Sequence, residues 1–242
     1  MILSKSNIIP TNTITLDVGT ISSGALANLQ NPDFSKVLSS NSTILEITIE
    51  AVGSSQFIAM HGLILPIGAV VTLTGTGYSK TYTMTRDIRN LVFYVSTAIT
   101  PGDLTIEISG AGEKTISYIQ AGAITKIDWG VSAGQNLRYL SHNKKSRITT
   151  NSRAMPTKAV QEEVSPKLTV NFTNAPKAFA RTEFLEVLNH YDTNNIVSML
   201  DYEDEGRPEE SYCLFDLNGG DVVAHPQTPL LVNISMSFRV SA

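Results

Sequence analysis

The sequence contains little cysteine, little charge and no long apolar run, and each shortage excludes a class of protein. Its 242 residues include a single cysteine, Cys213, which rules out an internal disulfide and a zinc site with several cysteine ligands. No apolar run approaches the roughly 18 residues of a transmembrane helix. The first residues also lack the basic and apolar regions of a signal peptide, so we expect a chain that is made and folded in a reducing cytoplasm.

Composition and length indicate a globular protein with two domains. Hydrophobic residues make up 42% of the chain and charged residues 17%, a balance that disfavours disorder and coiled coil. The net charge of −4 and the pI of about 5.6 provide no overall attraction to nucleic acids or anionic membranes. The length exceeds the commonest domain size of roughly 100–150 residues, which favours two cores. Frequent Ser, Thr, Asn and Gly favour strands and turns.

The first half alternates between apolar and polar residues in short segments. In residues 44–49, Leu45, Ile47 and Ile49 share one face, as in a half-buried strand. Further strands are predicted at 57–61, 70–74, 80–85, 91–96, 104–109 and 116–119. A spacing of about 10 residues is typical of a sandwich. We therefore predict an antiparallel jelly-roll β-sandwich over residues 1–127.

The second half, residues 128–242, is predicted to be a second β-rich domain that carries one helix. Apolar residues recur with the helical period from about 177 to 191, which places a helix there. Strands are predicted at 167–172, 196–200, 212–217 and 230–240, the last of them in the middle of a sheet. The fold class is therefore mainly β, with a domain boundary near residue 127.

Two charged segments are candidates for contacts between subunits. Residues 129–161 contain no acidic residue and are predicted to form a loop-rich basic arm. Its candidate interface residues are Arg138, Lys144, Lys145, Arg147 and Arg153. An acidic loop offers Asp201, Glu203, Asp204 and Glu205. This loop fits three interpretations: a solvated surface, a calcium site without the usual ligand spacing, or a partner for the basic arm in a homo-oligomer.

Signals for chemistry are weak, and we expect a protein that is not an enzyme and holds no cofactor or metal. Residues 130–134 match the G-x-S-x-G motif around Ser132, but that motif needs a strand before it and a helix after it. Asp201 and His225 follow in the chain order of triad partners, which an unrelated chain also shows. The histidines are scattered without metal-ligand spacing, at His61, His142, His190 and His225. Nucleic-acid binding is not expected, since Tyr139 is the lone aromatic residue of the basic segment 138–158.

Four segments resemble one family of viral proteins. They are residues 31–35, 44–49, 57–69 (FIAMHGLILPIGA) and 116–122 (ISYIQAG). Residues 26–126 thereby resemble the galactose-binding-like jelly roll at the start of certain tailed-bacteriophage structural proteins. The remainder is similar in pattern to the β-rich C-terminal domain of that group.

This resemblance implies a virion protein. It implies a minor tail or baseplate component, located in the virion, that assembles with copies of itself and with other structural proteins of the particle. A neck or head decoration protein is an alternative. A carbohydrate-binding module that contacts host surface polysaccharide is another, and its aromatic candidates are Tyr78 and Tyr82, near a glycine-rich turn. With few such rings, and Trp129 expected in the core of the junction, we expect the sandwich to act mainly as a structural spacer.

Overall fold

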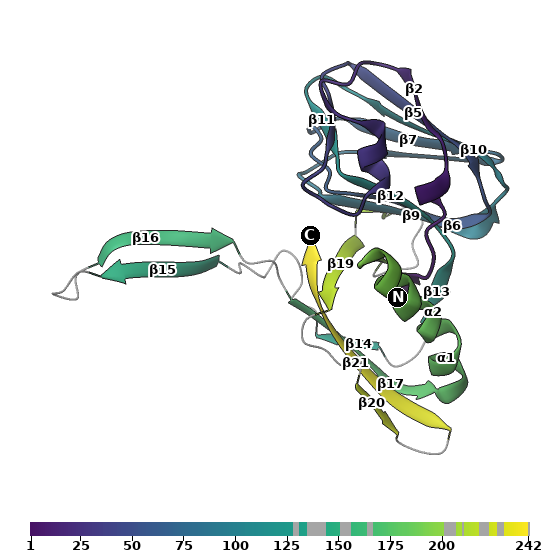
Figure 1. The fold of residues 1–242 in the computed structure, drawn as a ribbon, viewed down its shortest axis with the longest axis vertical. Helices are drawn as coiled ribbons and strands as arrows, with labels where there is room; N and C mark the ends of the chain where they lie inside the picture. Colours follow the sequence, from purple (N-terminus) through teal and green to yellow (C-terminus); the bar gives the residue numbers. More distant parts are fainter. Residues whose placement is uncertain are drawn as a thin grey trace.

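The protein is mainly β, and its sheets are antiparallel. A computed structural model describes residues 1–127, 131–134, 144–150, 156–163, 167–200, 207–209, 211–217, 223–226 and 230–241. Figure 1 shows a sandwich formed by the first half of the chain, a second sheet formed mostly by the second half, and a hairpin that extends away from both. In the described part of the chain, no helix is both long enough and apolar enough to cross a bilayer.

The strands of the sandwich confirm the predicted fold class. A five-stranded sheet has the order β2 (Ile14–Val18), β5 (Ile44–Val52), β10 (Gly102–Ser109), β7 (Val70–Gly75) and β8 (Tyr78–Thr83). A three-stranded sheet consists of β12 (Tyr118–Gly122), β6 (Ser55–His61) and β9 (Asn90–Ile99), and a smaller one of β11 (Lys114–Ile116), β4 (Leu38–Ser40) and β3 (Ser23–Gly24). The strand predicted at 116–119 is instead divided between β11 and β12 at Ser117. Two 3-10 turns, Ile9–Thr11 and Leu26–Gln30, complete this half.

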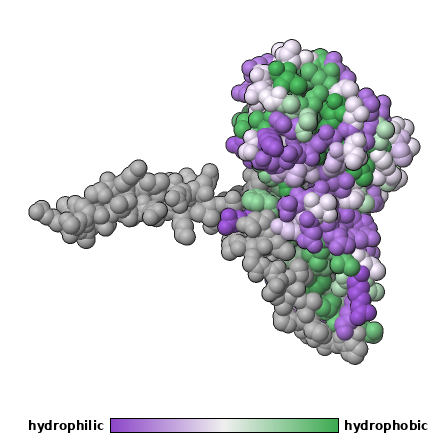
Figure 2. Space-filling model, viewed as in Figure 1, coloured by the Kyte–Doolittle hydropathy of each residue, from purple (hydrophilic) through white to green (hydrophobic). Residues whose placement is uncertain are grey.

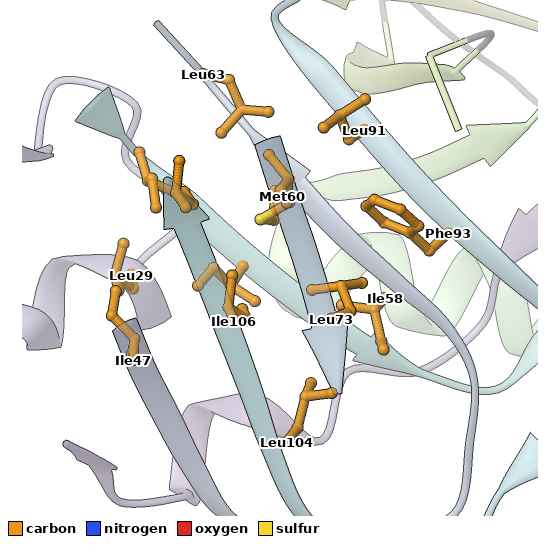
Figure 3. Close-up of a cluster of buried hydrophobic side chains, with 14 of the residues drawn as sticks. Leu29, Ile47, Ile58, Met60, Leu63, Leu73, Leu91, Phe93, Leu104 and Ile106 are labelled. Atoms are coloured by element: carbon orange, nitrogen blue, oxygen red, sulfur yellow. The ribbon is translucent and has the colours of Figure 1, made fainter. Parts of the chain in front are cut away.

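The main core lies between the five-stranded and three-stranded sheets. Alternate residues of β5 and β10, such as Ile47 and Ile106, point inward and have no exposed surface. Ile58 and Met60 of β6 and Phe93 of β9 meet them from the other sheet (Figure 3). Each fully buried side chain of this size contributes about 1.5–3 kcal/mol to folding. The alternation in the sequence therefore determines which face of each outer strand is buried.

The three-stranded sheet is buried on both of its faces. Phe57 and Ala59 of β6, together with Val92 and Tyr94 of β9, turn away from the main core. They pack against Ile2, Ile124 and Leu200 instead. The sequence of a strand that is covered on both faces is a continuous run of apolar residues, as in the buried strands of parallel sheets. The three-stranded sheet is thus a middle layer between the sandwich core and the second half of the chain.

The second sheet includes one strand from each end of the first half of the chain. Its order is β13 (Ile124–Lys126), β1 (Ile2–Ser4), β18 (Ile196–Leu200), β19 (Ser211–Leu217), β21 (Leu231–Ser241), β17 (Lys167–Pro176) and β14 (Val131–Gly134), and β20 (Val223–Pro226) also pairs with β21. β21 has neighbours on both sides, as predicted for the strand at 230–240. The boundary near residue 127 stays a prediction. The pairing of Leu3 with Met199 and Thr125 shows that the first strand belongs to this sheet.

The predicted helix at 177–191 is confirmed in two parts. α1 (Lys177–Arg181) and α2 (Glu183–Asn194) are separated at Thr182, whose φ of −113° and ψ of −86° interrupt the helix. Asn195 caps the C-terminus of α2: it adopts the left-handed conformation at φ 56°, and its N–H donates a hydrogen bond to the Tyr191 carbonyl. Phe184 and Val187 pack on the second sheet, whereas the exposed side chains of α2 are mostly hydrophilic (Figure 2), with Leu185 as an exposed apolar residue among them.

The predicted loop-rich arm contains regular structure, which is a difference from the prediction. β14 joins the second sheet, and β15 (Lys144–Thr150) pairs with β16 (Pro156–Glu163) as a separate hairpin. The polar composition of this segment lacks the apolar alternation that marks a half-buried strand. Backbone pairing, which composition does not reveal, therefore determines its structure.

Candidate functional site

A pocket lies where the β7–β8 turn meets the end of β9. Its volume is about 270 Å³. Its lining consists of Thr76, Gly77, Tyr78, Lys80 and residues 95–100. The β7–β8 turn has two central residues, since Gly75 pairs with Tyr78, and Gly77 accommodates its φ of +71° without a side chain. The turn forms one wall and β9 the other.

An irregular register forms the β9 wall of the pocket. Phe57 of β6 pairs with Tyr94, but Ser55, two residues earlier, pairs with Ile99. The residues between Tyr94 and Ile99 therefore bulge away from β6, and three of them, Ser96, Thr97 and Ala98, are exposed. Bulges of this kind redirect side chains at the rim of a sheet. Here the bulge opens the space that the pocket occupies.

The chemistry of the lining is rich in hydroxyl groups. Thr76, Ser96, Thr97 and Thr100 each contribute a hydroxyl that can both donate and accept a hydrogen bond. Tyr78 contributes an aromatic ring that is half-buried against the sandwich core, and Lys80 contributes an ammonium group. A ligand that fits this lining presents several hydroxyl or carbonyl groups and one apolar face.

A narrow cavity adjoins this pocket. It shares Ile99 and Thr100 with the pocket and is also lined by Ser55 and Asp103. Its volume is about 10 Å³, which is about the space that one water molecule needs. Ser55 is 1% exposed, and its Oγ has no hydrogen-bond partner within the described chain. A single water in this cavity would provide that partner.

The two predicted sugar contacts occupy different places. Tyr78 lines the pocket, whereas Tyr82 lies further along β8 and is not among the lining residues. Tyr82 is half-buried against the core, and burial, followed by the negative charge of Glu209, raises the pKa of its hydroxyl. Ser96, Thr97 and Thr100 were not predicted, because the register shift that exposes them depends on the pairing of β6 with β9.

A second cluster of polar side chains is buried between the two halves. His61 Nδ1 lies 2.9 Å from Asn90 Oδ1, and His61 Nε2 lies 2.7 Å from Ser198 Oγ. Ser198 Oγ lies 2.5 Å from the Gln120 carboxamide oxygen. His190 Nε2 lies 2.6 Å from the Gln120 nitrogen, and its Nδ1 lies 2.9 Å from Asn194 Nδ2. The cluster connects β6, β9 and β12 of the sandwich to β18 and α2.

Three members of this cluster have the relative placement of a serine nucleophile, a histidine base and an orienting amide. Burial excludes a catalytic role for these side chains. His61 has no exposed surface and Ser198 is 2% exposed, so a substrate cannot reach the hydroxyl. Burial lowers the pKa of His61 to about 4, and it lowers the pKa of His190 to about 4 as well. Both rings are therefore neutral at pH 7 and serve the packing of the two halves.

The G-x-S-x-G segment lies in an antiparallel ladder. Ser132 belongs to β14 and pairs with Asn171 of β17. A nucleophile elbow requires a sharp turn from a strand into a helix at the serine. His225 lies on β20 opposite Asn233, and Asp201 is outside the described residues. The geometry at Ser132 is therefore that of a sheet residue.

The predicted interface residues are described only in part. Lys144, Lys145 and Arg147 belong to β15, where the first two pair with Glu163 and Glu162 of β16. Glu162 and Glu163 were not among the predicted partners of the basic arm. The remaining interface residues, Arg138, Arg153, Asp201, Glu203, Asp204 and Glu205, lie outside the described residues. Across the ranges that are described, no group of three His, Cys, Asp or Glu side chains could hold a metal ion.

Comparison with known proteins gives only distant structural matches. No protein-family model matches the chain, and no curated protein is similar to it in sequence. The crystal structure of SpGH29 overlaps with a TM-score of 0.39 at 9% identity, over 50% of this chain and 28% of that one. A Streptococcus pneumoniae fucose binding module, SpX-3, overlaps with a TM-score of 0.38 at 11% identity. The overlap covers 51% of this chain and 99% of that module. The lectin binding domain of lectinolysin, complexed with Lewis b, overlaps with a TM-score of 0.40 at 9% identity. The overlap covers 49% of this chain and 96% of that domain. Overlaps of this size do not establish a shared ligand.

Proposed function

We propose that the sandwich is a carbohydrate-binding module and that the pocket between the β7–β8 turn and β9 holds one saccharide residue. The observation that carries this proposal is a pocket of about 270 Å³ with four hydroxyl side chains and the ring of Tyr78 in its lining. Its volume lies just below the range of roughly 300–1,000 Å³ that is typical of ligand pockets. Sugar hydroxyls exchange hydrogen bonds with Ser and Thr, and the apolar face of a pyranose packs on an aromatic ring.

The same lining favours binding over catalysis. Hydrolysis of a glycosidic bond in most enzymes needs two carboxyl groups on either side of that bond. Among the residues that line the pocket in the described chain, none is Asp, Glu or His. Tyr78 and Lys80 are its titratable groups. We therefore propose a non-enzymatic protein that contacts a polysaccharide, such as one on a host surface.

Substitution of Ala98 by tryptophan tests the proposal, because Ala98 is an exposed residue that lines the pocket. A monosaccharide of about 12 non-hydrogen atoms at about 0.3 kcal/mol each gives a dissociation constant of about 1–3 mM. We expect Ala98→Trp to weaken binding at least about 10-fold by filling the pocket. The measurement is calorimetric titration of the intact chain with a panel of mono- and disaccharides.

The matched control for this titration is Thr81→Trp. Thr81 is exposed on β8 but does not line the pocket, so this variant should bind like the natural chain. Equal binding by the natural chain and Ala98→Trp would place the ligand elsewhere. Absence of binding across the panel at about ten times the expected dissociation constant would exclude the carbohydrate role.

A second function, assembly within a bacteriophage tail or baseplate, is favoured by the β15–β16 hairpin. This hairpin forms its own two-stranded sheet and extends away from both halves (Figure 1). A two-stranded hairpin is marginally stable by itself in water, and a third strand or a packed surface is what stabilises it. We propose that neighbouring copies or other virion proteins provide that surface, as the sequence resemblance implies.

Charge reversal on the hairpin tests the assembly role. Lys144→Glu with Lys145→Glu places like charges at the positions paired with Glu163 and Glu162, and like charges directly opposite destabilise a ladder. We expect this double variant to lose self-association in light scattering, and we expect added Glu162→Lys and Glu163→Lys to restore it. A natural chain that stays monomeric and fails to join purified tail proteins would contradict the role.

A further inference from the structure

The hydrogen-bond cluster between the two halves has a single consistent arrangement of protons, which His190 determines. Both of its ring nitrogens lie beside carboxamide nitrogens, Gln120 Nε2 at 2.6 Å and Asn194 Nδ2 at 2.9 Å. A neutral imidazole accepts a hydrogen bond at one nitrogen and donates at the other, so both amides cannot donate to it. Asn194 Nδ2 also donates to the His190 carbonyl at 3.0 Å, which fixes the Asn194 orientation.

Gln120 is therefore the group that must turn. Hydrogen bonding decides which end of a carboxamide faces which neighbour. With its oxygen toward His190, Gln120 accepts from the Nε2–H of that ring, and its nitrogen donates to Ser198 Oγ. Ser198 then donates its own proton to His61 Nε2, and His61 Nδ1–H donates to Asn90 Oδ1, which is 2.9 Å away. Each link of this hydrogen-bonded cluster then joins one donor to one acceptor.

We infer that these six side chains form one hydrogen-bonded chain that closes the contact between the two halves only while His61 and His190 are neutral. An added proton on either ring turns an acceptor nitrogen into a donor. At His61 Nε2 that donor would meet the Ser198 hydroxyl hydrogen, and at His190 Nδ1 it would meet the Asn194 amide hydrogens. The contact between the halves is thus a switch that acid opens.

In the part of the chain that the structure describes, neither ring is hydrogen-bonded to a carboxylate that could compensate an added proton. Within the described residues, the side-chain hydrogen bonds of both rings come from amide and hydroxyl groups only. His61 also contacts Phe34 and stacks on Tyr118, which packs against buried Cys213. Glu186 lies one turn before His190 on α2, and its carboxylate pairs with Lys5 at 2.7 Å. Glu186 is thus engaged by Lys5.

The direction of the pH dependence follows from burial. Burial lowers the pKa of each ring from 6.5 to about 4 in the folded protein. The closed contact is therefore fully stabilised above about pH 6.5 and loses stability as the pH falls toward 4. When the pKa of a histidine is 6.5 in the open state and about 4 in the closed state, acid lowers the equilibrium constant for closing by about 300-fold for each histidine that becomes exposed on opening.

Nuclear magnetic resonance of the two imidazole rings tests the proton arrangement in the unmodified chain. We expect His61 to carry its proton on Nδ1 and His190 to carry its proton on Nε2, and we expect both rings to stay neutral down to about pH 4–5. The opposite tautomer at either ring, or titration of either ring near 6.5, would overturn the inference.

Hydrogen exchange then tests the opening. The Val92 amide of β9 donates to the Pro208 carbonyl across the contact at 2.9 Å, and the Thr115 amide donates to Ile64 within the sandwich at 2.9 Å. Between pH 6.5 and 4 we expect protection at Val92, corrected for the intrinsic rate, to fall by at least about 100-fold while Thr115 stays protected. Parallel loss at both amides, or no loss at either, would contradict a switch located between the halves.

A substitution of Gln120, at the centre of the hydrogen-bonded cluster, distinguishes an effect of the hydrogen-bond network on the histidine pKa values from an effect of burial alone. Gln120→Glu places a carboxylate beside His190 Nε2, which favours the imidazolium form. We expect the pKa of His190 to rise above 6.5, with a smaller change at His61. The matched control is Ser39→Ala, which removes a buried hydroxyl bonded to Thr115 at 2.9 Å and should leave both histidine titrations unchanged. An unchanged His190 titration in a folded Gln120→Glu variant would refute the inferred connection.

Discussion

Substitution of His61 by alanine is expected to lower the free energy of unfolding by about 3–5 kcal/mol. The ring has no exposed surface and stacks on Tyr118, so its removal leaves a cavity between the two halves. Asn90 and Ser198 also lose their bonds to the ring, and each polar group left unpaired in a buried site costs about 1–3 kcal/mol. Urea unfolding at pH 7, followed by circular dichroism, measures the loss.

The control for this variant is His61→Gln. A glutamine retains a hydrogen-bonding group within reach of Asn90 or Ser198, so it should cost less than alanine. A loss below about 1 kcal/mol for His61→Ala would mean that the two halves hold together without the cluster. Equal losses for alanine and glutamine would assign the effect to the cavity alone.

Substitution of Lys114 by methionine is expected to cost about 2–4 kcal/mol. Lys114 is fully buried on β11, and burial lowers the pKa of its ammonium group. Its Nζ donates to the backbone carbonyls of Ser42, Gly110 and Gly112 at 2.5, 2.6 and 3.2 Å. A hydrogen bond from a charged donor contributes about 1.5–3 kcal/mol, and the desolvation of the ammonium offsets part of the total. Methionine fills a similar volume but leaves three carbonyls without this donor.

Lys36→Met is the matched control for Lys114. Lys36 is exposed, and its ammonium lies 3.9 Å from Asp33 in a surface pair, which contributes at most about 1 kcal/mol. Guanidinium unfolding of the two variants side by side should therefore show a large loss for Lys114→Met and almost none for Lys36→Met. Similar losses would contradict the role of Lys114 in joining the loops around residues 42 and 110–112.

Local patterns in the sequence predicted most of the sandwich. In β5 and β10, apolar and polar residues alternate, and residues such as Ile47 and Ile106 are buried as that alternation requires. β1 was missed because a strand of three residues has too short a pattern to recognise, and its place beside β18 depends on a contact across the whole chain. The burial of Lys114 was missed because a lysine in a strand normally indicates an exposed position. Only folding brings three backbone carbonyls around its ammonium group.

The candidate sites depended even more on contacts distant in sequence. Tyr78 was predicted from its position beside a glycine-rich turn, and it lines the pocket. The hydroxyls of β9 enter the pocket through a register shift against β6 that local patterns do not contain. His61 and Ser198 are 137 residues apart, and Gln120 and His190 are 70 apart. A single sequence offers no signal for such pairs.

Chemical-shift mapping of the intact chain with a bound saccharide determines whether the pocket between the β7–β8 turn and β9 holds a sugar, because it locates a ligand without any substitution. With the sugar that binds tightest in the titrations, we expect saturable shifts concentrated in the backbone amides of residues 76–78, 80 and 95–100, which line the pocket. Saturable shifts centred on another surface, or no shifts at sugar concentrations of about ten times 1 mM, would contradict it.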